Sequence, residues 1–269
     1  MGIDKMFDLS GRVALVTGAA GSLGSAIATV YADAGADLLL FDIDGDGLQR
    51  MATELERSGQ LVRTVVGSVG DIQQITELFE FLDREFGKID ILVNVAGPAK
   101  LGKPEEIDLA DVAYSVHHLV TARFFICQQA GRRMLRARKG SIISICSVTG
   151  ITAIGRSHVP YSMSMAAVGH MTKELSTEWS GRGVRVNAIV CAQITNKGLE
   201  QRMAADPRER KNFLRGIPMG RLGRNEDIKG IALLLASDAS SFITGALIPL
   251  DGGNLAKNAG GSHPGMPEF

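Results

Sequence analysis

The sequence has no long hydrophobic run, no excess of either charge and few cysteines, and each absence excludes a class of protein. No apolar stretch approaches the roughly 18 residues that cross a bilayer. Residues 1–10 show no basic segment followed by an apolar core, so we expect neither a membrane partner nor a signal peptide. The 29 basic residues balance the 29 acidic ones, which argues against a nucleic-acid partner and leaves self-association unopposed.

Cysteine is sparse. Cys127, Cys146 and Cys191 are an odd number and lack the spacing of metal ligands or of a disulfide framework. Small buried thiols in a reducing compartment are the more common case. We therefore expect no bound metal and a location in the cytoplasm.

Short apolar runs alternate with amphipathic segments along the whole chain, which predicts buried parallel strands joined by crossover helices. The predicted strands are 13–16, 37–41, 61–66, 89–95, 141–145, 184–190 and 246–249. The predicted helices lie at 23–34, 47–58, 72–86, within 105–138, at 160–179 and at 225–236. The expected fold class is α/β: one domain, 1–269, with a doubly wound parallel sheet of about seven strands and helices on both faces.

Two segments break this alternation. Residues 192–216 are charged, irregular and longer than a usual strand-to-helix connection, so we expect a mobile substrate loop over a site. The C-terminal tail, residues 254–269, is rich in Gly and Asn, and we expect it at the periphery or against a neighbouring subunit.

A glycine-rich turn, Thr17–Gly24, stands between a predicted strand and a predicted helix. Glycines let the backbone approach a pyrophosphate, and the helix N-terminus presents free N–H groups to it. Such a stretch alone often marks an ordinary turn, but this context is the one that a dinucleotide site requires. Asp42, 24 residues after Gly18, ends the second predicted strand. Its carboxylate can bond the adenosine ribose and would repel a 2′-phosphate, so we expect NAD rather than NADP.

Further motifs make the chain resemble the short-chain dehydrogenase/reductase family, and within it the sugar, polyol and sugar-acid dehydrogenases. The glycine-rich pattern falls on Thr17–Gly24, the Asn-Asn-Ala-Gly pattern on 94–97, and the catalytic Ser and Tyr on Ser147 and Tyr161. The resemblance continues through 185–187 to 251–253 and covers nearly the whole chain. It implies a Rossmann-type fold, NAD as hydride carrier, Tyr161 as general acid or base, and Ser147 as the residue that positions the substrate oxygen.

The resemblance also implies an assembly and a set of cofactor contacts. In the family, the helix that carries the Tyr and the long helix before it form a four-helix interface, which implies a homotetramer, with a homodimer as the alternative. The residues that the resemblance places against NAD are Gly18, Ser22, Leu23, Gly24, Asp42, Ile43, Ser68, Val69, Asn94, Ala96, Gly97, Tyr161 and Thr195.

Several of these positions depart from the family pattern. Ser22 replaces a turn glycine, at a small cost if its φ is negative and about a kcal/mol if it is positive. The family's Asp-Val pair beside the adenine is Ser68-Val69, and the second Asn of Asn-Asn-Ala-Gly is Val95. The Pro-Gly pair beside the nicotinamide is residues 191–192, Cys-Ala.

The most consequential departure is Met165, which stands where the family has the Lys of its Tyr-x-x-x-Lys motif. That Lys bonds the nicotinamide ribose, and its positive charge lowers the pKa of the Tyr. A neighbouring cation typically lowers the pKa of an acid by about 1 to 3. Its loss implies slow turnover, or dependence on alkaline pH or a substitute base. The family's active-site Asn falls on Val120 in the alignment without an insertion, and on His117 or His118 in the alternative.

Arg156 and His158 precede Tyr161 and are candidates for the substrate side of the site. Arg156 can pair with a carboxylate, and His158 can assist proton transfer, although a solvated Arg and a surface His are the more common roles. Two functions stay open at this point. The first is an NAD(H)-dependent oxidoreductase, with impaired catalysis, that interconverts a secondary alcohol and a ketone on a small sugar-like substrate. The second is an inactive NAD(H)-binding relative that acts as a sensor or assembly subunit.

Overall fold

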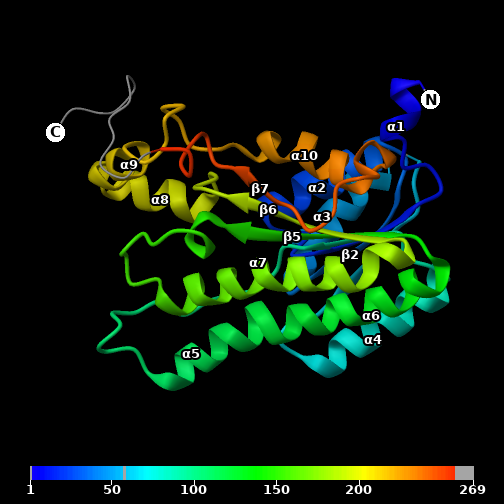
Figure 1. Ribbon diagram of the computed structural model, residues 1–269, viewed down its shortest axis with the longest axis horizontal. Coiled ribbons are helices and arrows are strands. Elements are labelled where there is room, and N and C mark those ends of the chain that lie inside the picture. The colour runs from blue at the N-terminus through cyan, green and yellow to red at the C-terminus, as the bar shows by residue number, and fades with distance from the viewer. Residues whose placement is uncertain (1, 57–58, 258–269) are drawn as a thin grey trace.

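The computed structural model describes residues 2–56 and 59–257. In these residues one parallel sheet of seven strands runs through the molecule in the order β3-β2-β1-β4-β5-β6-β7 (Figure 1). The α/β fold class is confirmed, and each strand lies within two residues of its predicted bounds. The strands are β1 (Val13–Thr17), β2 (Asp37–Asp42), β3 (Val62–Val66), β4 (Ile91–Asn94), β5 (Gly140–Ser147), β6 (Val184–Cys191) and β7 (Leu247–Leu250).

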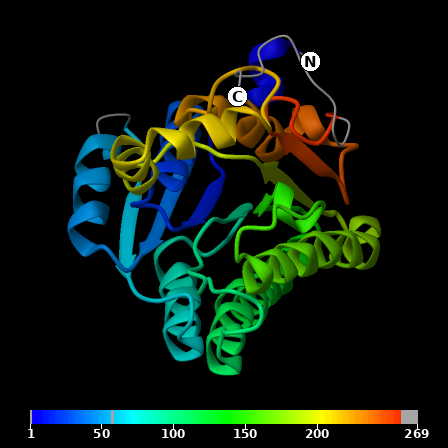
Figure 2. The ribbon, with the colours of Figure 1, turned by 90° about the vertical axis from the view of Figure 1, so that its left-hand side faces the viewer.

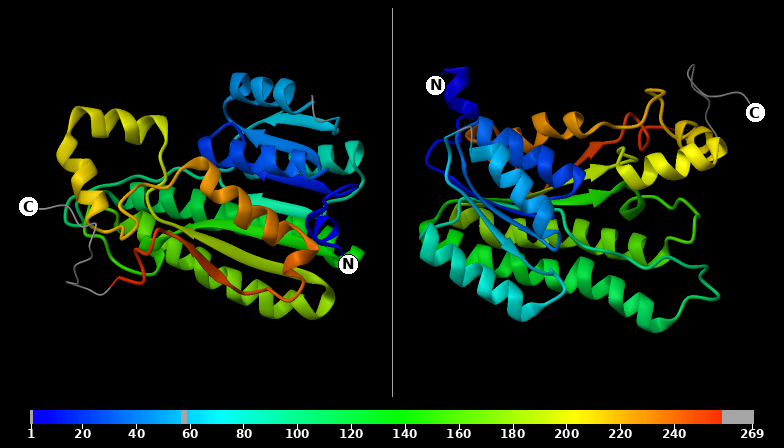
Figure 3. Two further views of the ribbon diagram at one scale, coloured as in Figure 1. Left: turned by 90° about the horizontal axis from the view of Figure 1, so that it is seen from above. Right: turned by 180° about the vertical axis from the view of Figure 1, so that it is seen from behind.

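Helices cover both faces of the sheet, because alternate residues of each buried strand point to opposite sides. Leu38 and Leu40 of β2 belong to the core under one helical layer, whereas Leu39 and Phe41 belong to the core under the other, and all four are fully buried. The first layer holds α2 (Ser22–Asp33), α3 (Gly45–Leu55) and α10 (Lys229–Ala236). The second holds α4 (Ile72–Glu85), α5 (Leu109–Val116), α6 (Ala122–Ala137) and α7 (Val159–Trp179) (Figures 1 and 3).

The long helix expected within 105–138 is not continuous. A π-helical turn, His117–Thr121, separates α5 from α6, so the backbone takes one extra residue per turn at this point. A short N-terminal helix, α1 (Ile3–Phe7), was also not predicted. None of the described helices is both long and apolar enough to cross a lipid bilayer.

Residues 192–216 are not irregular, and that prediction was wrong. They form α8 (Lys197–Ala205) and α9 (Pro207–Leu214). Asn196 caps α8 by accepting a hydrogen bond from the N–H of Leu199 at 2.9 Å, and Asp206 caps α9 by accepting from the N–H of Arg208 at 3.0 Å. These capping residues override the charged composition that favoured a loop. Of the C-terminal tail, residues 254–257 are described, and Asn254 Nδ2 donates to the carbonyl of Gly216 at 2.6 Å; residues 258–269 lie outside the described part.

The carboxyl ends of all seven described strands meet at one edge of the sheet, which faces the viewer in Figure 2. The helices α8 and α9 lie at this edge (Figure 1). Strand order reverses between β1 and β4, which are neighbours in the sheet although two strands separate them in the sequence. In open α/β sheets, ligands bind at the carboxyl edge beside such a reversal.

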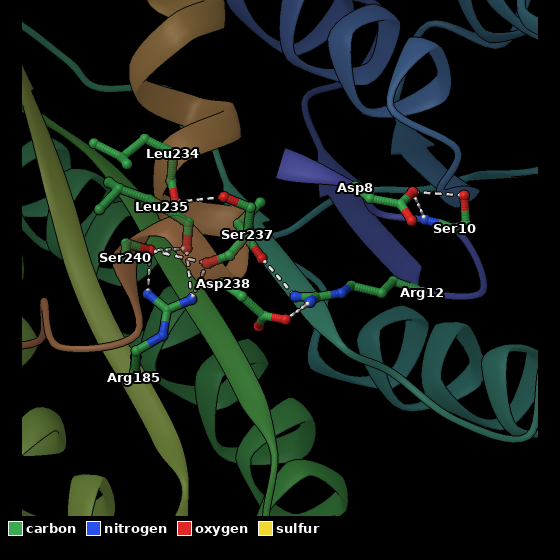
Figure 4. A network of polar contacts seen from close by, with 10 residues as sticks. Asp8, Ser10, Arg12, Arg185, Leu234, Leu235, Ser237, Asp238 and Ser240 are labelled. Carbon is green, nitrogen blue, oxygen red and sulfur yellow. Dashed lines mark hydrogen bonds and ion pairs between the residues drawn. The ribbon is translucent and has the colours of Figure 1, made fainter. Parts of the chain in front are cut away.

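The opposite edge carries a network of hydrogen bonds and an ion pair that fixes the starts of two strands (Figure 4). Arg185 in β6 donates to Ser240 Oγ at 2.8 Å and to the carbonyls of Leu235 and Ser237 at 2.9 and 3.2 Å. Arg12, just before β1, forms an ion pair with Asp238 at 2.7 Å. The network ties β1 and β6 to the end of α10.

This network yields a prediction about stability. Arg185→Met removes three donated hydrogen bonds from a part-buried network, so the free energy of unfolding should fall by about 1.5–3 kcal/mol in urea denaturation. Arg182→Met, at an exposed position on the turn before β6, is the matched control and should change it little. Equal losses in both variants would contradict this role of Arg185.

Candidate functional site

The turn between β1 and α2 depends on close backbone contacts that only glycine allows. Gly18 has a φ of 69°, and a Cβ on Gly24 would lie 2.0 Å from the carbonyl oxygen of Gly18. The first N–H groups of α2 have no acceptor within the helix and open toward the carboxyl edge. Ser22 is the first helical residue and is not among the positive-φ residues, so replacing the family's glycine there costs little.

Asp42 holds this turn from the end of β2. One carboxylate oxygen accepts from the N–H of Ala20 at 3.0 Å, and the other accepts from the N–H of Asp44 at the same distance. Ile43, next in the chain, is 73% exposed at the same edge. A fixed negative charge therefore lies beside the glycine-rich turn, with an exposed apolar side chain next to it.

The loop after β4 packs directly against the glycine-rich turn. A Cβ on Gly18 would lie 2.9 Å from the backbone nitrogen of Ala96, and Thr17 Oγ1 accepts from this nitrogen at 3.4 Å. Gly97 has a φ of 145° and faces Leu119. Asn94 lies deeper: it is 1% exposed, and its amide donates to Cys127 Sγ at 3.2 Å. The side chain of Asn94 thus supports the loop from the core side.

The loop after β3 contacts the π-helical turn. Ser68 Oγ accepts from the N–H of Gly70 at 3.1 Å, Val69 is buried, and His117 Nε2 lies 2.7 Å from the carbonyl oxygen of Gly70. His118 also faces Gly70, and its ring packs on Tyr114.

Val120, by contrast, packs in a cluster with Met165 and Tyr161. Of the three candidates for the active-site Asn position, Val120 is therefore the one that belongs to the same cluster as Tyr161.

Ser147 and Tyr161 meet where β5 ends and α7 begins. Ser147 Oγ accepts from the N–H and the hydroxyl of Thr149, at 3.2 and 3.1 Å, which fixes the 3-10 turn Val148–Gly150. A Cβ on Gly150 would lie 2.7 Å from the carbonyl carbon of Met165, so this turn lies directly on the backbone of α7. The contact brings Tyr161 within hydrogen-bonding reach of Ser147.

The surroundings of Tyr161 act on its pKa in opposite directions. Burial raises the pKa of Tyr161 above its ordinary value, and the neighbouring thiols Cys146 and Cys191 add to this. The hydrogen bond with Ser147 and the positive charge of Arg123 lower it, and burial prevails. Met165 is 2% exposed and apolar, so α7 supplies no charge at the position of the family's Lys. Sequence reasoning missed Arg123; its signal was that it is the lone charged residue in the run 119–127, which is otherwise apolar apart from Thr121.

A cavity of about 710 Å³ opens beside Ser147 and Tyr161. Arg156 and His158 are among its lining residues, and α8 and α9 contribute Arg202 and Phe213. No acidic residue is among the described residues that line it. The Arg156 guanidinium lies 4.5 Å from the centre of the Phe213 ring, and the His158 and Tyr161 rings are 6.3 Å apart. Thr195 follows the lining residue Ile194 in the sequence, and its hydroxyl donates to the carbonyl of Gly223 at 3.2 Å.

Comparison with known proteins identifies this arrangement. A family model described as enoyl-(acyl carrier protein) reductase matches residues 18–254. D-threitol dehydrogenase of Mycolicibacterium smegmatis is 36% identical over 261 residues, which is 96% of this chain and 98% of the relative. The chain belongs to the short-chain dehydrogenase/reductase family.

Solved structures of family members have the same fold. One is named as an NAD(P)-dependent gluconate 5-dehydrogenase from Beutenbergia cavernae with NADP bound at low occupancy; it is 34% identical, with a TM-score of 0.88 over 94% of this chain and 100% of that one. Another, xylitol dehydrogenase with bound NAD+, is 26% identical, with a TM-score of 0.85 over 90% of this chain and 98% of that one. These two solved members of the family thus contain different nicotinamide cofactors, NADP in one and NAD+ in the other.

Proposed function

We propose that this protein is an NAD(H)-dependent oxidoreductase that interconverts a secondary alcohol and a ketone on a small sugar-like substrate. The observation that carries the proposal is that Ser147 and Tyr161 lie together in the wall of one cavity at the carboxyl edge, with Arg156 and His158 in the same lining. Relatives named as threitol, xylitol and gluconate dehydrogenases support this substrate class.

The residues at the glycine-rich turn fit a dinucleotide. A Cβ at Gly18 would collide with the backbone of Ala96, and one at Gly24 would collide with the carbonyl of Gly18, so glycines keep this turn tight at the N-terminus of α2, where a pyrophosphate would bind. Asp42 places a carboxylate where an adenosine ribose would lie and disfavours a 2′-phosphate. We therefore propose NAD as the cofactor, in contact with the residues named above for it. When bound, NAD supplies the hydride acceptor for alcohol oxidation.

The two hydroxyl groups then have separate tasks. Ser147 bonds the substrate oxygen and holds it next to Tyr161. Tyr161, as phenolate, accepts the hydroxyl proton while the alcohol carbon loses its hydride; in the reverse direction the phenol returns this proton to the forming alkoxide. The side chains of α8 and α9 cover the substrate and reduce its contact with water, which is the role we expected for residues 192–216.

The charge of the cavity favours a substrate that carries a carboxylate. Arg156, His158 and Arg202 line it, while acidic residues are absent from its described lining. Guanidinium groups bind carboxylates with paired, charge-assisted hydrogen bonds. A sugar acid fits this cavity better than a neutral polyol of the same length.

A second candidate is an inactive NAD(H)-binding relative that acts as a sensor or assembly subunit. The observation that favours it is that Met165 is apolar and buried among apolar side chains, so α7 lacks the family's cation. This reading requires that NADH binds while no sugar, polyol or sugar acid is oxidised at any pH between about 7 and 10.

Cofactor preference is the first test of the proposed enzyme. Asp42→Ala removes an acceptor for the ribose hydroxyls and the charge that repels a 2′-phosphate, so NAD should bind about 10- to 100-fold more weakly. NADP should bind no more weakly than before, and calorimetry measures both affinities. The exposed Asp46→Ala, four residues on, is the control. An unchanged ratio of the two affinities would remove Asp42 from the cofactor site.

The substrate's charge is the second test. Arg156→Met should raise KM about 10- to 100-fold for an aldonate, since it removes a charge-assisted contact, and should change KM for the matching alditol less than about threefold. Arg208→Met, on α9 but outside the cavity lining, serves as the control. Similar losses for both substrates would mean that Arg156 shapes the cavity without reading the carboxylate.

Assembly follows the same proposal. The layer that contains α6 and α7 leaves Phe124 43% and Met163 53% exposed, which suits an interface between copies of the chain. We propose a homotetramer, with a homodimer as the alternative, so light scattering at micromolar concentration should give four times the 28.6 kDa of one chain. A mass of one chain would contradict both. The three buried, unpaired thiols fit the cytoplasmic location that we propose.

A further inference from the structure

Arg123, in the first turn of α6, is a buried side chain that joins the ends of two strands. It is 3% exposed. Nη1 donates to the carbonyl of Ile145 in β5 at 2.7 Å, and Nη2 donates to the carbonyl of Ala96, in the loop after β4, at 3.0 Å. Nε is buried and has no hydrogen-bond partner among the described residues. The guanidinium therefore lies under the carboxyl edge, between the glycine-rich turn and Ser147.

No acidic side chain in the described part of the chain is paired with the charge on Arg123. Among the described side chains its electrostatic partners are the thiols of Cys127 and Cys146 and the phenol of Tyr161. Burial lowers the pKa of Arg123, but an arginine in a protein stays protonated. A buried cation without a counter-ion is costly to a fold, and Arg123 also leaves one donor unused. These costs indicate a task for the charge beyond tying two carbonyls together.

We propose that Arg123 supplies, from α6, the positive charge that the family's Lys supplies from α7, and so stabilises the phenolate of Tyr161. The proposal rests on the proposed oxidoreductase function, in which Tyr161 is the proton acceptor. Arg123 is a positioning residue: its guanidinium acts on the substrate through Tyr161. The buried guanidinium of Arg123 then replaces the positive charge that is lost where Met165 stands in place of the family's Lys.

The packing around Tyr161 is consistent with this replacement. Val120, in the π-helical turn that leads into α6, packs in the cluster with Met165 and Tyr161. The other polar groups that face Tyr161 are Ser147, the thiols of Cys146 and Cys191, and His158.

The thiols cannot take the place of the cation. Burial raises the pKa of Cys191 to about 12 and raises that of Cys146, so both are neutral at pH 7. Within the described surroundings of Tyr161, Arg123 is thus the permanent positive charge.

A spectroscopic titration of the protein without cofactor tests the proposal directly. Tyrosine ionisation is followed by ultraviolet difference absorbance, and subtraction of the Tyr161→Phe curve isolates Tyr161. Arg123→Gln keeps a donor for one carbonyl but removes the charge, so the pKa of Tyr161 should rise by about 1 to 3. Arg123→Lys should leave it near the parent value. Ser147→Ala provides a reference for the loss of the hydrogen bond alone, and His158→Gln controls for the other titratable ring.

Kinetics supply the second readout. In Arg123→Gln the alkaline rise of alcohol oxidation should move to higher pH by the same amount, with kcat at pH 7 reduced about 10- to 1000-fold. Adding Met165→Lys to Arg123→Gln should return both the pH profile and kcat toward the parent. Met165→Lys alone should not raise kcat, because Arg123 already supplies the cation in the parent protein. Urea denaturation establishes that each variant is folded.

The outcomes separate this inference from the proposed function. An unchanged Tyr161 titration in folded Arg123→Gln overturns the role of Arg123 whether or not any alcohol is oxidised. A raised pKa in a protein that oxidises no substrate upholds the charge and contradicts the enzyme. If Arg123→Gln does not fold, nuclear magnetic resonance of the parent decides: the Arg123 Nε signal should titrate with the midpoint of Tyr161 and lose this midpoint in Tyr161→Phe. The absence of that coupling overturns the proposal.

Discussion

The parallel direction of the strands is the constraint on which the site depends. It sends the carboxyl ends of β1, β2, β4 and β5 to one edge, and the reversal of strand order between β1 and β4 opens the space between their loops. Four short segments that are far apart in the sequence therefore converge: the glycine-rich turn, Asp42, the Ala96 loop and Ser147. None of them needs a long loop to reach the others, which keeps the site on rigid elements.

Within that frame, the close contact of Gly150 with α7 sets the chemistry. It places the turn after Ser147 directly on the helix that carries Tyr161, so both hydroxyl groups lie in the wall of the same cavity. The same helix carries Met165 one turn later. Because this side chain is apolar, the positive charge near Tyr161 comes from a neighbouring helix. Arg123 donates hydrogen bonds to carbonyls at the end of β5 and just after β4, so the two strands that frame the pocket also hold the cation in place.

Much of this fold could be predicted from the sequence, because buried strands and amphipathic helices leave strong periodic signals. The glycine-rich turn and Asp42 could be found for the same reason: each has a fixed place relative to a strand. The rest depends on features that periodicity does not carry. The charged composition of this segment favoured a loop and so concealed α8 and α9. Their caps, Asn196 and Asp206, are single residues that leave no periodic signal in the sequence. Arg123 escaped notice because burial of a lone Arg is decided by tertiary contacts with Ile145 and Ala96.

The π-helical turn His117–Thr121 has a consequence for the history of the site. An α-helix advances by about 100° per residue, so one residue more or less in that turn would swing every later side chain of α6 by more than a quarter of a revolution. Arg123 would then leave the ends of β4 and β5, and a different side chain would face Tyr161. The angular phase of one helix thus decides which chemical group reaches the pocket, and a single codon gained or lost there can exchange it without any change to the sheet.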